Sequence, residues 1–550
     1  EKLSNRERKE LFEAAYRSFT EPPGSLPASD VLEQLNDPLY SQPLLITVDA
    51  LLNAHPLSNS RVSCSPSELF EEVLRHEERY WAEHWPSSLA VNTDRGQQRT
   101  AAANSADTQG NLNRKLARQA VAAATLADIQ DEEDAIALLN FLPANPGTST
   151  KDLARWLRDC YPPHSDETNH PSLWCEHLEP DRIGEHLIVS EADDLEPLLR
   201  KLLYPSRVGT PSLRTWTVLE RASTDPHLNE RVGRILNEVL VEVCQAVHTQ
   251  AVESQSSDLT AGFVKLFSAV RSHIDPDVSY QAKDTLPEGN YLTIFLEYEL
   301  SQHAAEIIIR TDDTSEPDQA TYALRRLSLS RCLANIGRPD DALKVAEQAT
   351  NHYRTLVESN PASYTPDLAT SLNTLAVYLT DNGWHHEALE ASLEATDLYR
   401  DLAKHNPAAY KPNLASCLNT LAILQAENGR KRKALKTSRR ATDLYRDLAK
   451  HNPAAYKPNL ASCLNTLAIL QAENGRKRKA LKTSRRATDL YRDLAKHNPA
   501  AYKPNLASCL NTLAILQAEN GRKRKALKTS RRATDLYRDL AKHNPAAYKP

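Results

Sequence analysis

The apolar residues of segment 406–451 fall on two helical stripes that are separated by a short polar break. Asn428 and Gly429 form this break, because glycine supplies the left-handed residue that commonly closes a helix. A second break follows at Asn452-Pro453, so the spacing predicts one helix before each break. Pro412, the last residue of the connector NPAAYKP, is expected in the first turn of the first helix. The first stripe consists of Leu414, Leu418, Leu421, Ala422 and Leu424, and the second of Ala434, Leu435, Ser438, Ala441, Leu444, Tyr445 and Leu448.

This 46-residue unit is repeated along the chain. It recurs unchanged at 452–497 and 498–543, and residues 544–550 repeat its first seven residues. A diverged copy occupies 360–405, and one period earlier Gly337 stands one unit before Gly383. We therefore expect five units over 314–543. A fixed period of this size predicts stacked helix pairs, each burying its apolar face on its neighbours, and hence an all-α fold with an α-solenoid.

The repeat resembles the tetratricopeptide repeat, in the long form found in kinesin light chains and in many bacterial signalling proteins. The resemblance implies a right-handed solenoid whose first helices line a concave groove. It also implies that an asparagine in each first helix faces a protein partner there, where an amide can both donate and accept a hydrogen bond. The alternative role for these amides is a hydrogen bond to the neighbouring repeat. The resemblance rests on Leu418, Leu421-Ala422, Gly429, Ala434-Leu435, Ser438 and Ala441, and the candidate asparagines are Asn373, Asn419, Asn465 and Asn511.

Residues 1–313 show helical patterning without a repeat. The polar stretch 86–111 is expected to be a loop, and Ser149 and Thr150 are expected to cap a helix. The candidate helices are 4–19, 67–85, 112–127, 131–142, 150–160, 191–203, 228–249 and 291–309. The expected domains are a helical region at 1–145, a winged-helix-like segment at 146–215, a helical linker at 216–313 and the repeats at 314–543.

Residues 149–190 contain a second resemblance, in the order of a tryptophan-leucine helix, CYPP and LWCEHLEPDRIGEHLIVS. This order resembles the winged-helix segment of bacterial STAND ATPases that end in tetratricopeptide repeats. Residues 43–52 and 66–81 resemble the region that follows the ATPase core of that family. The resemblance implies that the array is the sensor or autoinhibitory arm of a signalling or defence ATPase.

Catalysis by this chain is not expected. The sequence has no GxxxxGK[ST] phosphate loop and no GxSxG elbow, so any ATPase residues of a parent protein would precede Glu1. No cofactor is expected. A second alternative function is the non-catalytic part of an enzyme, such as a protease, linked to the repeats.

Five potential zinc ligands crowd into eighteen residues, but their spacing matches no common pattern of closely spaced ligand pairs. We therefore expect no metal site and a proline-rich loop with incidental histidines. The eight cysteines form no CxxC pair and are expected to be reduced core thiols. His186 is expected to be a structural or surface histidine, although the STAND resemblance would place it near a nucleotide. The potential ligands are Cys160, His164, His170, Cys175 and His177.

Charge is divided unevenly along the chain. Each identical copy carries +7, and the three copies with Lys549 carry +22, which leaves −27 for residues 1–405 within a total of −5. A run of charges on a helix is most commonly a solvated face. Like charges in adjacent repeats also repel, which costs stability unless an anionic partner compensates, so an anionic partner is the alternative. The candidate basic ladder consists of Arg430, Lys431, Arg432, Lys433, Lys436, Arg440, Arg476, Lys477, Arg478, Lys479, Arg522, Lys523, Arg524 and Lys525.

The favoured function is therefore a protein–protein interaction scaffold. Its partner would be an acidic surface or peptide, including the acidic N-terminal part of this chain, within one molecule or between molecules of a homo-oligomer. Sequence-independent nucleic-acid binding is the first alternative, but the basic residues lack the interleaved aromatic residues that usually stack on bases. No signal peptide or membrane span is expected from the sequence, which predicts a cytoplasmic location.

Overall fold

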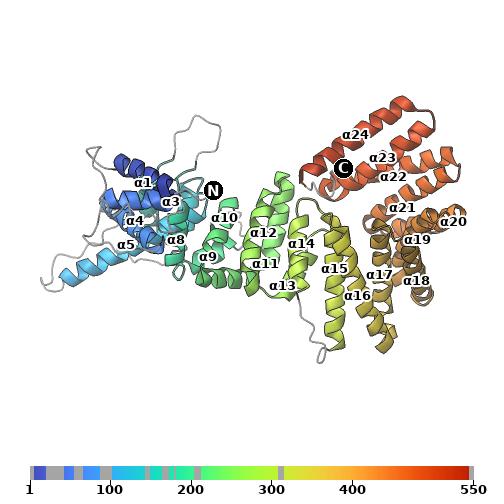
Figure 1. The fold of residues 1–550 in the computed structure, drawn as a ribbon, viewed down its shortest axis with the longest axis horizontal. Helices are drawn as coiled ribbons and strands as arrows, with labels where there is room; N and C mark the ends of the chain where they lie inside the picture. Colours follow the sequence, from blue (N-terminus) through green and yellow to red (C-terminus); the bar gives the residue numbers. More distant parts are fainter. Residues whose placement is uncertain are drawn as a thin grey trace. The chain divides into compact units, whose positions relative to one another are not determined.

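A computed structural model describes residues 5–19, 43–54, 66–86, 102–142, 149–163, 173–178, 181–203, 212–306 and 315–543. Helices dominate these ranges and no strand occurs in them, so the predicted all-α class is confirmed (Figure 1). The chain divides into two compact units. Unit 1 comprises residues 1–239 with 265–273, and unit 2 comprises 240–264 with 274–550.

Unit 1 is a helical domain with three tryptophans in its core. Trp81, Trp156 and Trp216 are each at most 1% exposed. α1 packs on α3, and both α4 and α5 pack on α8. The helices are α1 (Asn5–Phe19), α3 (Pro43–Ala54), α4 (Pro66–Glu83), α5 (Ala102–Leu126), α6 (Glu132–Leu139), α7 (Thr150–Cys160), α8 (Asp181–Glu191), α9 (Glu196–Leu203), α10 (Leu213–Ala222) and the first part of α11 (Pro226–Ser254).

A buried arginine joins α4, α5 and α8. Nε of Arg118 donates to Glu191 at 2.6 Å, and Nη1 donates to Glu78 at 2.8 Å and to Glu71 at 3.1 Å. A buried cation with several carboxylate partners is satisfied, whereas removing the cation would leave those carboxylates uncompensated. Arg118 therefore holds the three helices in one arrangement.

Several expectations for the N-terminal part are corrected. The expected loop at 86–111 is wrong over 102–111, because α5 begins at Ala102. The expected helix at 191–203 is the end of α8 followed by α9. Ser149 caps α7 as expected, since its side chain accepts from the backbone N–H of Asp152. The described part of 146–215 contains α7 to α10, and the winged-helix-like segment stays a prediction.

Unit 2 begins with short helices and continues into ten long ones. The short helices are the second part of α11, α12 (Asp258–Val270, shared with unit 1), α13 (Pro276–Asp284) and α14 (Ile294–Ala304), with a 3-10 turn of unit 1 at Arg271–His273. The long helices are α15 (Glu316–Asn335), α16 (Pro339–Ser359), α17 (Pro361–Asp381), α18 (His385–His405), α19 (Pro407–Glu427), α20 (Lys431–His451), α21 (Pro453–Glu473), α22 (Lys477–His497), α23 (Pro499–Glu519) and α24 (Lys523–His543).

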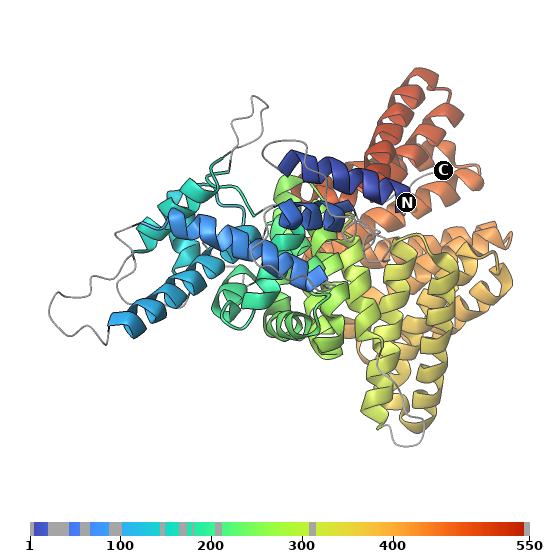
Figure 2. The ribbon, with the colours of Figure 1, turned by 60° about the vertical axis from the view of Figure 1, so that its left-hand side comes forward.

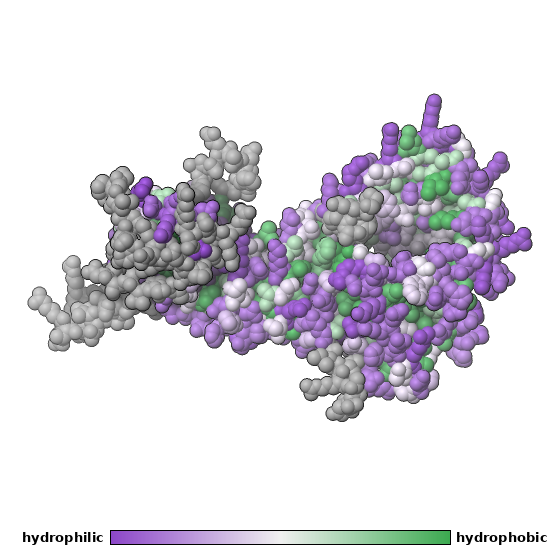
Figure 3. All heavy atoms as spheres, in the orientation of Figure 1, coloured by the Kyte–Doolittle hydropathy of each residue, from purple (hydrophilic) through white to green (hydrophobic). Residues whose placement is uncertain are grey.

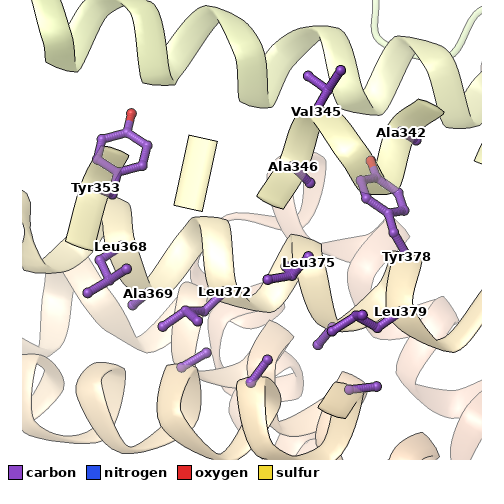
Figure 4. Packing of buried hydrophobic residues seen from close by; sticks show 14 of the residues in the cluster. Ala342, Val345, Ala346, Tyr353, Leu368, Ala369, Leu372, Leu375, Tyr378 and Leu379 are labelled. Atoms are coloured by element: carbon purple, nitrogen blue, oxygen red, sulfur yellow. The ribbon is translucent and has the colours of Figure 1, made fainter. Parts of the chain in front are cut away.

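These ten helices form five pairs, as the period predicts. We call the first helix of each pair its A helix (α15, α17, α19, α21, α23) and the second its B helix (α16, α18, α20, α22, α24). Each helix packs on the next one along the chain, so the pairs stack in order (Figures 1 and 2). Figure 4 shows side chains from α16 and α17 meeting between the first two repeats. The predicted small residues of the third repeat, Ala422, Ala434, Ser438 and Ala441, are all fully buried.

The expected NPAAYKP connector is wrong, because it belongs to the A helix. A single residue, Asn406, separates α18 from α19, and its side chain accepts from the backbone N–H of Ala409. Pro407 therefore takes the first helical position, and Pro412 lies inside the helix. The A helix begins before Pro412 because its first turn packs on the preceding B helix: the ring of Tyr410 lies 6.3 Å from that of Tyr399.

The Asn-Gly turn between the two helices of a repeat is confirmed. Gly429 has φ of +73°, and the backbone N–H of Arg430 donates to the carbonyl of Gln425 at 2.7 Å. This closes α19 with a left-handed residue, as predicted. The turn also joins neighbouring repeats, because Nδ2 of Asn428 donates to the carbonyl of His385 at 3.2 Å.

Candidate partner-binding surfaces of the repeat array

The A helices form one wall of the array. α17 contacts α19, α19 contacts α21, and α21 contacts α23, so A helices approach one another across repeat boundaries. The side of each A helix that faces away from the B helices is polar and only partly buried. In α19 this side carries Asn419, Thr420 and Ile423. We call it the inner face.

The predicted groove asparagines lie on this inner face. The Oδ1 atoms of Asn373, Asn419 and Asn465 are buried and accept no hydrogen bond from the described residues. Asn511, in the last repeat, is exposed. The alternative role, a hydrogen bond to the neighbouring repeat, is therefore not recorded for the first three carbonyl oxygens.

An exposed branched aliphatic residue follows each of these asparagines by one helical turn. Such a residue is costly to leave in water, and the four stand at the same position of consecutive A helices, beside the amides. We call them the aliphatic strip. This strip was not anticipated from the sequence, although its spacing of four residues from each asparagine could have revealed it. The strip consists of Val377, Ile423, Ile469 and Ile515, which are 38–53% exposed.

A different asparagine joins the repeats. Nδ2 of the turn asparagine donates to the first backbone carbonyl of the preceding B helix, at 3.2 Å for Asn428 and Asn474 and at 3.4 Å for Asn382 and Asn520. The hydrogen bond to the neighbouring repeat is therefore made by these four turn asparagines.

The predicted basic ladder lies at the start of the B helices. All fourteen residues are exposed, and no ion pair joins any of them to another described residue. Lys431, Arg432 and Lys433 occupy the first turn of α20, where the helix dipole is positive and acidic residues are favoured. The equivalent turn of α18 has Glu387 and that of α16 has Asp340 and Asp341. The cations of the ladder therefore oppose the helix dipole and repel one another.

Farther along the B helices the charges are paired. Nζ of Lys450 lies 2.9 Å from Asp447, and Arg446 pairs with Asp443. These exposed pairs contribute little to stability. The cations without a carboxylate partner are therefore those at the start of each B helix in the identical copies.

The cysteine–histidine cluster of unit 1 is not assembled as a metal site in the described residues. No group of three His, Cys, Asp or Glu side chains there could hold a metal ion, and His164 and His170 lie outside these residues. Cys160 and Cys175 are buried, and burial raises the pKa of each thiol to about 12. Thiols of this kind are unreactive core groups.

His186 has a structural partner in unit 1. Its Nε2 lies 3.4 Å from Glu71, and its ring lies 6.0 Å from that of Phe70. The hydrogen bond from His186 and the nearby Arg118 guanidinium lower the pKa of the Glu71 carboxyl to about 2. The contact fits the expected structural role of His186.

No helix among the described residues has both the length and the apolar character that crossing a membrane would require.

Comparison with known proteins gives remote structural neighbours. No family model matches the chain, and no curated protein matches it. Nearly identical TPR-like repeats from Podosopora anserina share 16% identity, cover 42% of this chain and 100% of their own, and have a TM-score of 0.32. A STAND protein with a tetratricopeptide repeat sensor from Pyrococcus horikoshii shares 14% identity over 100% of this chain and 74% of its own, with a TM-score of 0.33. Aspartyl phosphate phosphatase F from Bacillus subtilis shares 9% identity over 87% and 96%, with a TM-score of 0.36.

TM-scores this low do not identify the repeat type, which follows instead from the arrangement of the chain's own helices. Five antiparallel helix pairs stack in sequence order, each closed by a left-handed glycine such as Gly429. Small residues at Ala422, Ala434 and Ala441 are fully buried where paired helices meet. Residues 315–543 therefore form an α-solenoid of five 46-residue helix pairs, which is the fold of tetratricopeptide-type repeats.

Proposed function

We propose that the repeat array is a protein–protein interaction scaffold whose inner face binds an extended segment of a partner protein. The observation that carries this proposal is the repeated pairing of an unbonded amide with an exposed aliphatic residue. Asn419 and Ile423 form one such pair on α19, and Asn465 and Ile469 form the next on α21. Rotation of each amide side chain would turn its oxygen toward the N–H donors of an extended backbone, whose side chains would cover the aliphatic strip.

The rigidity of the array supports this function. The inner-face side chains stand on 21-residue helices that are joined by the turn asparagines and by small buried residues. A binding surface fixed in advance loses little conformational entropy when a segment docks. Buried carbonyl oxygens without a donor cost free energy in the unbound array, and rotation of the amides toward a partner's N–H groups would remove that cost.

Panning a random-peptide library against the full chain tests the proposal. Selected peptides should lose about tenfold or more in affinity for the triple variant Ile423→Ser, Ile469→Ser, Ile515→Ser, because each lost apolar contact is worth on the order of 1 kcal/mol. Lys411→Ser with Lys457→Ser is the matched control, since both lysines are exposed on the same A helices. Peptides that bind the serine triple variant as tightly as the unchanged chain would refute the inner-face assignment.

We also infer that the array is the sensor arm of a STAND-type ATPase whose nucleotide-binding core is not in this chain. The support is the resemblance of residues 149–190 to the family's winged-helix segment and the packing of α4 on α8, which joins the two resembling stretches. Calorimetric titration of the full chain with ATP and ADP should give no saturable heat. Saturable binding would show that a nucleotide site lies within the chain and would contradict this assignment.

A further inference from the structure

One salt bridge joins the side chains of two consecutive B helices. We call such a pair of facing residues, one on each of two consecutive B helices, a rung. Nη2 of Arg354 on α16 lies 3.2 Å from a carboxylate oxygen of Glu394 on α18. The two residues are 40 positions apart and both are close to half exposed. The rung therefore lies on the surface, between consecutive B helices, away from the inner face.

One period later the same rung has two cations. The equivalents of Arg354 and Glu394 are Arg400 and Arg440 at the next junction. The copies at 452–497 and 498–543 are identical, so this substitution recurs. The three twin-arginine rungs are Arg400 with Arg440, Arg446 with Arg486, and Arg492 with Arg532.

Only one arginine of each rung has a carboxylate. Arg400, Arg446 and Arg492 each pair with an aspartate three residues earlier on the same helix. Arg440, Arg486 and Arg532 are exposed, and none of them forms an ion pair with another described residue. Each rung thus has one guanidinium that is free to bind an anion beside a second one.

The last rung lines a hollow. Arg492 on α22 and Arg532 on α24 flank a depression of about 520 Å³, with Leu506 and Leu510 of α23 also in its lining. Figure 3 shows hydrophilic side chains projecting from the surface of these last repeats, with apolar residues visible between them. The lining has the chemistry to bind an acidic side chain, because leucine covers a methylene stem and arginine binds its carboxylate.

The carboxylates already present in the hollow are occupied. Asp535 lies 3.1 Å from Arg538, and Asp539 lies 3.2 Å from Lys503. The hollow therefore keeps a positive surplus at Arg532, where an incoming anion would bind.

We propose that the twin-arginine rungs bind glutamate or aspartate side chains of an acidic polypeptide that lies across consecutive B helices. The fold itself supplies the precedent, because Glu394 fills the equivalent place at the first junction. Consecutive A helices pack on one another but consecutive B helices do not pack closely, so the rungs lie farther apart than the roughly 10 Å of packed helices. An extended chain rises ~3.3 Å per residue, so a matching segment carries its acidic residues three or more positions apart. This surface is separate from the inner face, and the inference does not depend on the proposed groove.

Nucleic acid is the rival occupant, since arginine also binds phosphate in a bidentate manner. Single-stranded nucleic acid usually stacks its bases on aromatic side chains. No tyrosine of the described part of the three identical copies is exposed; Tyr445 and Tyr491 are buried and the others are partly buried. The surface therefore favours carboxylates.

Fluorescence anisotropy with the full chain tests the inference. The probe is a labelled 18-residue peptide of the repeating sequence Glu-Ser-Ala, and the rival probe is a labelled 20-nucleotide single-stranded DNA. The triple variant Arg440→Gln, Arg486→Gln, Arg532→Gln should weaken peptide binding about tenfold or more, since each charge-assisted bond is lost. The matched control is Lys436→Gln, Lys482→Gln, Lys528→Gln, which removes the same charge one turn earlier on the same helices and should weaken binding less than about threefold.

Equal weakening by both triple variants would indicate general attraction to a basic surface and would overturn the inference. So would an absence of peptide binding, or DNA binding that depends on the same arginines while the peptide does not bind. A second variant, Arg440→Glu, Arg486→Glu, Arg532→Glu, restores the Arg–Glu arrangement of the first junction. It should raise the Tm and abolish peptide binding, and a lowered Tm or retained binding would contradict the rung assignment.

Discussion

Lys503 on α23 lies over the ring of Tyr291, with its Nζ 5.8 Å from the ring centroid. The same amino group lies 3.2 Å from Asp539 on α24. Tyr291 precedes α14, so a residue near the start of unit 2 contacts the last repeat of the array. The array therefore closes on its own unit at this point.

Leu540 supports the same closure. It clusters with Ala251, Tyr291 and Leu292 and is fully buried. Leu448 and Leu494 stand at the same place in the two identical copies before it, and both are only partly buried. Because the three sequences are identical, the added burial of Leu540 comes from its position at the end of the array.

Replacing Lys503 by Gln should loosen this closure. The change removes a cation–π contact and an ion pair at a partly exposed site, which together are worth on the order of 1 kcal/mol. Hydrogen exchange of the backbone amides of 290–293 and 537–541 should accelerate. Lys457→Gln is the matched control, since Lys457 is exposed at the same position of the preceding copy and forms no ion pair with described residues. Equal acceleration by both variants would contradict the closure.

The repeat structure of the array could be predicted from the sequence, but its contact with Tyr291 could not. The period, the two helices per repeat and the glycine at position 429 follow from local pattern, because helical spacing and turn chemistry are written in each copy. The contact of Lys503 with Tyr291 cannot be predicted from a local pattern, since Lys411, Lys457 and Lys503 have identical neighbours in sequence. The curvature of the whole array decides which copy contacts Tyr291.

The candidate site divides in the same way. The position of Asn419 on the A helix was predictable from the family resemblance, and the exposure of the basic residues was predictable from the helical pattern of apolar positions in the B helix. The start of α19 was misplaced because Pro412 reads as a helix boundary, whereas the contact of Tyr410 with Tyr399 continues the helix around it. The bridging role of Asn428 depends on a carbonyl 43 residues away, which no local pattern shows.

Replacing Asn474 by Ala should destabilise unit 2 by about 1 kcal/mol, because it removes a hydrogen bond between repeats and one to its own helix. Urea unfolding followed by circular dichroism measures the change. Asn511→Ala is the control, since Asn511 is exposed and forms no hydrogen bond with described residues. If Asn511→Ala proved as costly as Asn474→Ala, the bridging bond would not be the cause.

Glu297 should make unit 2 less stable as pH rises. It is 1% exposed on α14, and one carboxylate oxygen accepts from the backbone N–H of Gly289 at 3.1 Å. Burial raises its pKa from 4.5 to about 7, with Lys283 and Arg331 opposing and Glu288 reinforcing the shift. The folded state thus holds a proton that the unfolded state releases, and stability falls between pH 4.5 and about 7.

Glu297→Gln should remove this penalty, since the amide is neutral at every pH. The variant should gain about 3 kcal/mol over the unchanged chain at roughly pH 8 and little at roughly pH 4. Urea unfolding at several pH values measures the difference. Glu347→Gln, at an exposed position of α16 that forms no ion pair with another described residue, is the control and should leave the pH profile nearly unchanged. A Glu297→Gln profile parallel to that of the unchanged chain would refute the raised pKa.

Deletion of residues 452–497 removes one complete repeat and joins two identical neighbours. The new junction of α20 with α23 reproduces the old junction of α20 with α21 residue for residue, so the shortened array should fold cooperatively. Its denaturation midpoint should fall, because one repeat and one interface are lost.

The deletion also moves the last repeat by roughly one helix spacing, ~10 Å, which takes Lys503 out of reach of Tyr291. Lys503→Gln should therefore destabilise the full chain but leave the shortened chain unchanged, as a double-mutant cycle measures. An equal effect of Lys503→Gln in both chains would mean that this lysine acts within its own repeat and that the array does not close through Tyr291.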